Sequence, residues 1–106
     1  MGFTITVQEL KQSMDKGDKI VLIDVREPWE YATAKIPGSI LIPLATLPQS
    51  LDKLDKNAEI VCQCHHGMRS ADATTFLSQQ GFKNVKNLVG GIDAWSKQID
   101  PGVPRY

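Results

Sequence analysis

One short segment carries most of the side chains that could do chemistry in this sequence, namely Cys64-His65-His66-Gly67-Met68-Arg69-Ser70. It lies between an apolar run typical of a buried strand and an amphipathic run typical of a helix. At such a junction loop N–H groups can converge on the Cys64 sulfur, Gly67 permits the tight turn, and the helix directs its positive dipole end there. A thiol in that setting is expected to have its pKa lowered from about 8.5 to roughly 3.5 to 7.5. The segment therefore predicts a thiolate nucleophile at Cys64, the alternative being a buried cysteine that only packs.

The charged and imidazole side chains of this segment each allow two interpretations. Arg69 could steer an anionic substrate, or it could pair with a carboxylate such as Asp24 or Glu30 beneath the loop. His65 and His66 could assist proton transfer, but neither has a carboxylate near it in the sequence. Paired histidines in a loop are more often solvated, so we do not expect them to be essential for catalysis.

Cys62 lies two residues before Cys64, on the same face of an extended strand. The Cα atoms of such a pair lie near the upper limit for a disulfide, so Cys62 is expected to be a buried core thiol rather than a resolving thiol. These cysteines and the adjacent histidines, His65 and His66, also resemble metal ligands. A tetrahedral ion normally draws its ligands from two segments of a chain, and these residues form one run, so no metal is expected.

The elements that must hold this loop follow from hydrophobic patterning. Strands are predicted over 19–25, 39–42, 59–63 and 84–88, and helices over 7–16, 29–32, 70–80 and about 92–99. Leucines at helical spacing over 44–54 indicate a further helix, which Pro48 weakens. This alternation predicts an α/β fold with an open, mainly parallel sheet and helices on both faces. The site is then expected at the carboxyl ends of the strands.

Composition excludes several classes of protein. The chain has 106 residues, which fits one domain, and 12 Lys and Arg balance 12 Asp and Glu. A neutral chain lacks the basic excess that nucleic-acid binding needs. Two cysteines so close together build no disulfide framework, which favours a reducing, cytoplasmic setting. No apolar run is long enough to cross a membrane and no signal peptide is recognised, so no membrane partner is expected.

Several segments, in order, resemble the rhodanese-like sulfurtransferase domains, over nearly the whole of residues 1–106. The matching segments are Asp24-Val25-Arg26-Glu27 with Glu30-Tyr31, Ile36-Pro37-Gly38-Ser39-Ile40 with Pro43, the loop Cys64 to Ser70, and Gly81-Phe82 with Gly90-Gly91-Ile92-Asp93-Ala94-Trp95. The final segment 100–106 is similar to the tail found where this domain ends an adenylating activator of a sulfur carrier.

The resemblance implies a three-layer rhodanese-like fold with about five strands, and a sulfurtransferase that needs no cofactor. Cys64 would take sulfane sulfur from thiosulfate or a protein persulfide, and would pass it to a thiol, cyanide or a sulfur-carrier protein. Loop residues 65–70 would bind the persulfide, while Asp24, Arg26 and Glu30 would anchor the loops behind it. The alternatives are a non-catalytic binding module and a phosphatase. The phosphatases of this fold carry one more residue in the loop, which forms a wider cradle.

Overall fold

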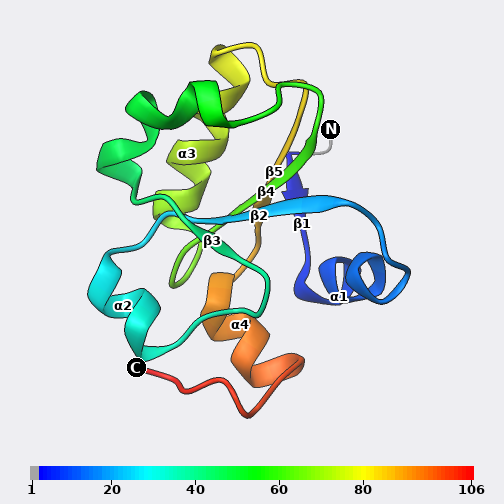
Figure 1. The fold of residues 1–106 in the computed structure, drawn as a ribbon. Helices are drawn as coiled ribbons and strands as arrows, with labels where there is room; N and C mark the ends of the chain where they lie inside the picture. The colour runs from blue at the N-terminus through cyan, green and yellow to red at the C-terminus, as the bar shows by residue number, and fades with distance from the viewer. Residues whose placement is uncertain (1–2) are drawn as a thin grey trace.

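The computed structural model describes residues 3–106, which form one parallel β-sheet with helices on both faces (Figure 1). The strands are β1 (Thr4–Ile5), β2 (Ile20–Asp24), β3 (Ile40–Leu41), β4 (Glu59–Gln63) and β5 (Asn84–Leu88). Their order across the sheet is β1-β5-β4-β2-β3, and every pairing is parallel. The carboxyl ends of the strands therefore meet at one edge, where β4 lies between β2 and β5.

The helices divide into two layers. They are α1 (Val7–Asp15), α2 (Pro28–Thr33), the 3₁₀ helix η1 (Leu44–Lys53), α3 (Met68–Gln79) and α4 (Gly91–Gln98). One face of the sheet packs against α1 and α4, and the other packs against α3 and η1 (Figure 1). None of the helices within residues 3–106 has the length and apolar character to cross a membrane.

Successive side chains of β4 and of Cys64, the residue that follows it, point alternately to the two faces of the sheet. Ile60, Cys62 and Cys64 belong to the apolar cluster on the α3 side, whereas Val61 belongs to the cluster on the α1 and α4 side. All four residues are buried. A strand buried on both faces reads as a continuous apolar run, which is why this one is visible in the sequence.

The predicted α/β architecture is confirmed, and β4 and β5 span the expected residues. The predicted N-terminal helix is also confirmed, with Thr6 and Glu9 forming a reciprocal capping box. Strand β1 was not expected, because two residues are too few to show a periodic pattern. It is defined by its pairing with β5, in which Thr4 lies opposite Asn87.

Two helices differ from the prediction. The leucine-rich segment forms the 3₁₀ helix η1 with Pro48 inside it. Proline has no N–H to donate to the fourth preceding residue, so it opposes an α-helix there. Helix α3 begins at Met68, two residues before the predicted start at Ser70, because Gly67 adopts a left-handed conformation (φ +113°) at its N-cap.

Candidate active site

Cys64 directly follows β4, and its sulfur accepts hydrogen bonds from the loop that comes after it. The Gly67 N–H lies 3.0 Å from Sγ, the Ser70 N–H 3.5 Å and the Ser70 hydroxyl oxygen 3.3 Å. The residue as a whole is only 2% exposed. The loop therefore surrounds the sulfur atom with hydrogen-bond donors and leaves little of Cys64 open to solvent.

Helix α4 gives this loop its orientation. At its start the Ile92 N–H donates to the Cys64 carbonyl at 2.9 Å, and the Asp93 N–H donates to the His65 carbonyl at 3.1 Å. The first N–H groups of a helix have no acceptor within the helix, so α4 can bind these carbonyls without losing any of its own hydrogen bonds. With the carbonyls turned towards α4, N–H groups of the same loop are free to face the sulfur.

The surroundings of Cys64 favour its thiolate. Burial raises the pKa of Cys64, but hydrogen bonds from the Ser70 hydroxyl and from loop N–H groups outweigh burial, so the pKa lies below the ordinary value of a cysteine. The N-terminal end of α3 adds a favourable dipole. The direction agrees with the sequence-based prediction for this thiol.

Cys62 has the opposite surroundings, although it lies on the same face of β4. It is fully buried in the apolar cluster, and burial raises its pKa to about 12. Both cysteines are free thiols. A thiol with so high a pKa stays protonated at neutral pH, so only Cys64 has the surroundings of a nucleophile.

Asn87 on β5 belongs to the site and was missed in the sequence. Its Nδ2 donates to the Gly67 carbonyl at 3.1 Å, and its Oδ1 accepts a hydrogen bond from the Ser70 hydroxyl. Ser70 has a single hydroxyl proton, so Asn87 and Cys64 Sγ share it. A polar residue within a predicted strand was the available signal. The groups that Asn87 binds, however, depend on the pairing of β5 with β4, where Asn87 lies opposite Cys62.

Glu30 is the carboxylate that binds Arg69. Two parallel hydrogen bonds of 2.7 and 2.9 Å join the guanidinium to both Glu30 oxygens, and they lower the pKa of Glu30 to about 2. Asp24 instead binds Arg26, and both of these side chains are fully buried. Arg26 also donates to the Ala34 carbonyl at 2.6 Å, which connects the end of β2 to the end of α2. Each arginine of the site is thus neutralised by its own carboxylate.

The two histidines lie at the mouth of the loop, where the structure adds a carboxylate that the sequence did not reveal. His66 is 64% exposed in its side chain, and its Nε2 lies 3.7 Å from Asp93 Oδ2. The ligand atoms of His65, His66 and Asp93 lie within 4.8 Å of one another. Asp93 also pairs with Lys97 at 3.2 Å and Arg105 at 3.1 Å, so a metal ion there would compete with two cations for one carboxylate.

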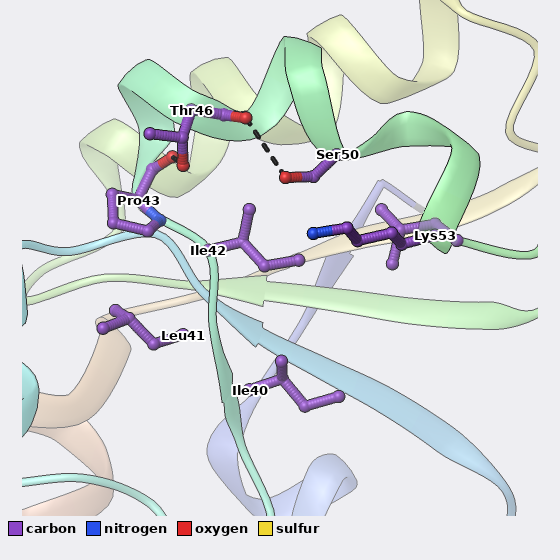
Figure 2. A pocket seen from close by; sticks show the side chains of 8 residues that line it. Ile40, Leu41, Ile42, Pro43, Thr46, Ser50 and Lys53 are labelled. Carbon is purple, nitrogen blue, oxygen red and sulfur yellow. Dashed lines mark hydrogen bonds between the residues drawn. The ribbon is translucent and has the colours of Figure 1, made fainter.

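One groove on the surface lies away from this loop. Figure 2 shows it along β3 and η1, with a volume of about 270 Å³ and a lining that includes Ile40, Ile42, Pro43 and Lys53. None of the residues that line it belongs to the loop 64–70. Met68 of the loop is 83% exposed. The candidate site is accordingly a loop wrapped around one sulfur atom.

Comparisons with known proteins agree with this geometry. The family described as Rhodanese-like domain matches residues 6–98. A protein named "Sulfurtransferase" from Allochromatium vinosum is 34% identical over 93 residues, which cover 88% of this chain and 87% of that protein. A solved rhodanese-like domain protein from Staphylococcus aureus aligns with a TM-score of 0.85 and 33% identity, over 100% of this chain and 99% of the other.

Longer proteins match as well. The protein named "Probable adenylyltransferase/sulfurtransferase MoeZ" from Mycobacterium tuberculosis is 41% identical over 107 residues, which cover 99% of this chain but 27% of that protein. The chain therefore spans about a quarter of the length of this relative. Since the family match spans residues 6–98 and a relative that is 34% identical is covered over 87% of its length, the chain belongs to the family of rhodanese-like domains.

Proposed function

We propose that this protein is a sulfurtransferase that carries sulfane sulfur as a persulfide on Cys64. The observation that carries the proposal is the set of donors around Cys64 Sγ: the Gly67 N–H, the Ser70 N–H and the Ser70 hydroxyl. These donors favour a thiolate, which is the attacking form of cysteine. Relatives named sulfurtransferases support the same activity.

The proposed reaction has two steps. With thiosulfate, the Cys64 thiolate attacks the outer sulfur, a new S–S bond forms, the S–S bond of thiosulfate breaks, and sulfite leaves with the electron pair. In the second step cyanide or an acceptor thiolate attacks the outer sulfur of the persulfide. The Cys64–S bond to that sulfur breaks, and Cys64 leaves as a thiolate. Each step displaces one sulfur anion by another nucleophile, so no external oxidant or reductant is needed.

The loop stabilises negative charge in both steps. The sulfur is anionic before attack and after release, and N–H donors fixed before the reaction need no rearrangement as that charge moves. Arg69 is already bound by Glu30, so its role is to hold the loop, and an anionic donor would be attracted chiefly by N–H groups and the end of α3. We therefore propose a scaffold role for Arg69.

The low exposure of Cys64 restricts the partners that can reach its sulfur. A residue that is 2% exposed is reached only by a slender group, such as thiosulfate, cyanide or the extended end of a protein chain that bears a sulfur. A relative named "Putative sulfur carrier protein YrkF", which is 39% identical over 91% of this chain, supports a sulfur-carrier protein as acceptor. Both cysteines are free thiols, the state that the cytoplasm maintains, so we place the reaction there.

The test compares wild type with Cys64→Ser and the matched variant Cys62→Ser. Each is incubated with thiosulfate, intact mass is measured for the gain of one sulfur atom, and thiocyanate formation is assayed after cyanide is added. We expect wild type and Cys62→Ser to gain sulfur and form thiocyanate, and Cys64→Ser to do neither. Full activity of Cys64→Ser would contradict the proposal.

The same experiment separates the alternatives. A non-catalytic binding module would form neither the persulfide nor thiocyanate in the wild type with thiosulfate or a small persulfide as donor. A phosphatase would hydrolyse p-nitrophenyl phosphate in a Cys64-dependent way. We expect no such hydrolysis for two reasons. The donors around Sγ are placed to hold one sulfur atom. Arg69, the arginine of the loop, is bound by Glu30 and is therefore not free to bind a phosphate group.

A further inference from the structure

The segment that follows α4 returns to the active site. In Figure 1 it turns back from the end of α4 and runs below that helix, and the chain ends beside α2. Val103 is buried in the apolar cluster, and its carbonyl accepts a hydrogen bond from the Ser96 hydroxyl. The Val103 N–H donates to the Asp100 carbonyl at 3.0 Å. The segment is therefore fixed to the domain before it reaches its last residue, Tyr106.

Tyr106 contacts three parts of the site at once. Its hydroxyl accepts a hydrogen bond from Arg26 Nη1 at 2.7 Å and donates one to Glu30 Oε2 at 2.7 Å. Its ring stacks on His65 with centroids 4.3 Å apart and planes inclined by 16°. The ring also meets Trp29 edge to face at 5.8 Å. One side chain thus joins the end of β2, helix α2 and the loop after β4.

We propose that Tyr106 is a positioning residue for the Cys64 loop, in which the hydroxyl keeps Glu30 bound to Arg69 and the ring keeps His65 at the loop mouth. The catalytic consequence rests on the function proposed above. The effect on the loop itself does not, because it concerns contacts that are present before any sulfur donor arrives.

The Tyr106 hydroxyl bridges two buried charged side chains, Arg26 and Glu30. Asp24 occupies Nε and Nη2 of Arg26, which leaves Nη1 to the Tyr106 hydroxyl. Glu30 Oε2 receives Arg69 Nη2 and the same hydroxyl. Without that oxygen, Arg26 Nη1 would lack a partner, Glu30 Oε2 would keep only Arg69 Nη2, and the Arg26 and Glu30 side chains would attract each other across the gap. Glu30 would move towards Arg26, and its two hydrogen bonds with Arg69 at the start of α3 would weaken.

The ring has a separate task at the mouth of the loop. His65 lies between the ring of Tyr106 and the ring of His66, whose centroid is 4.0 Å away. The His65 carbonyl is the group that α4 binds through Asp93. A fixed His65 ring therefore also restrains the peptide that turns loop N–H groups towards Cys64.

The test uses Tyr106→Phe, Tyr106→Ala and the control Tyr31→Phe. Tyr31 also has a half-buried hydroxyl, which donates to the Ser39 carbonyl at 2.7 Å, away from the Cys64 loop. The first measurement is the second-order rate constant for alkylation of Cys64 by iodoacetamide near pH 7. The second is the KM and kcat for thiosulfate with cyanide, and the third is the proton NMR of the His65 ring.

We expect Tyr31→Phe to stay within about twofold of wild type in alkylation and turnover. Tyr106→Phe loses both hydrogen bonds of the hydroxyl to charged groups, and this loss reaches Cys64 only through Glu30 and Arg69. It should lower the alkylation rate constant and kcat by about tenfold and leave the His65 ring shifts near those of wild type. Tyr106→Ala should lower both rates further and move the His65 ring protons downfield, since the stacked ring is gone.

Three results would overturn the proposal. The first is alkylation within about twofold of wild type in both Tyr106 variants. The second is a thermal midpoint that falls in Tyr106→Phe while alkylation stays unchanged, which would assign Tyr106 to stability alone. The third is an unchanged His65 spectrum in Tyr106→Ala. If wild type forms no persulfide, the proposed function fails, yet alkylation and NMR still decide the role of Tyr106.

Discussion

A side-chain carbon added to Gly91 would lie 2.2 Å from the carbonyl oxygen of Cys64. The same carbon would lie 2.7 Å from the carbonyl oxygen of His65. Gly91 also has a positive φ of +57°. Residue 91 is therefore glycine for two reasons, and the stronger one is that the backbone of the nucleophile packs directly against it.

Gly91→Ala should damage the active-site loop beyond the cost of backbone strain. The added carbon pushes on the Cys64 carbonyl, which must leave the Ile92 N–H, so Cys64 should lose part of its donor shell. We expect a loss of several kcal/mol in unfolding free energy, from about 1 to 2 kcal/mol of left-handed strain plus the clash. Alkylation of Cys64 by iodoacetamide at neutral pH should also slow.

Gly38→Ala is the matched control, because Gly38 has φ +85° and open space where a Cβ would point. It should lose only about 1 to 2 kcal/mol and keep the Cys64 alkylation rate. Urea unfolding and alkylation kinetics measure both effects. Equal behaviour of the two variants would show that close packing against Cys64 is unimportant.

Ser70→Ala should raise the pKa of Cys64. The variant removes the hydroxyl that lies 3.3 Å from Sγ but keeps the Ser70 N–H, so one of the donors that favour the thiolate is lost. A hydrogen bond to a charged group is worth about 1.5 to 3 kcal/mol, which corresponds to an upward shift of about one to two pH units. The midpoint of Cys64 alkylation rate against pH measures this shift.

Ser78→Ala provides the control on the same helix, since Ser78 lies on α3 and its side chain is exposed. Its alkylation profile should match that of wild type. A Ser70→Ala profile that coincides with it would mean that the hydroxyl proton stays on Asn87 and contributes nothing to the thiolate.

Local patterns in the sequence predicted those helices and strands whose signal is complete within one short segment. The apolar run of β4 and the capping box of Thr6 and Glu9 are examples, and the structure has both where they were expected. The resemblance to a known family extended this to the architecture of the whole domain. The position of Cys64 after a strand also follows from local sequence.

The rest of the site depends on contacts between segments far apart in the chain. Asn87 reaches Gly67 and Ser70 because β5 pairs with β4, and Asp93 reaches His66 because α4 begins against the loop. Tyr106 reaches Glu30 from 76 residues away. Register and packing determine these contacts, and no periodicity in one segment reveals them.

The two cysteines should react at very different rates in the folded protein. The pKa of Cys62 is raised to about 12 by burial, whereas that of Cys64 is lowered by its donors, so only Cys64 offers thiolate at neutral pH. Iodoacetamide at neutral pH should add one label to the native chain and two after denaturation in urea, as read by intact mass and peptide mapping. Rapid double labelling of native protein, or a single label on Cys62, would contradict this assignment.

The bond between Glu30 and Arg69 should make the protein less stable in acid. Because the pKa of Glu30 is about 2 in the folded protein and about 4.3 in an unfolded chain, its contribution is fully present above about pH 5. It is lost as pH falls towards 2, and amounts to at most about 3 kcal/mol. The difference in unfolding free energy between wild type and Glu30→Gln should therefore narrow as pH is lowered from about 5 to 2.

Glu59→Gln is the control for this pH dependence. Glu59 lies at the start of β4, the end of the strand away from Cys64. It forms no ion pair with any residue in the range 3–106. Urea unfolding of both variants is measured at several pH values. If the difference between Glu30→Gln and wild type changed with pH no more than the difference between Glu59→Gln and wild type, Glu30 would not titrate as a bound carboxylate, and the Arg69 contact would have to be held by something other than charge.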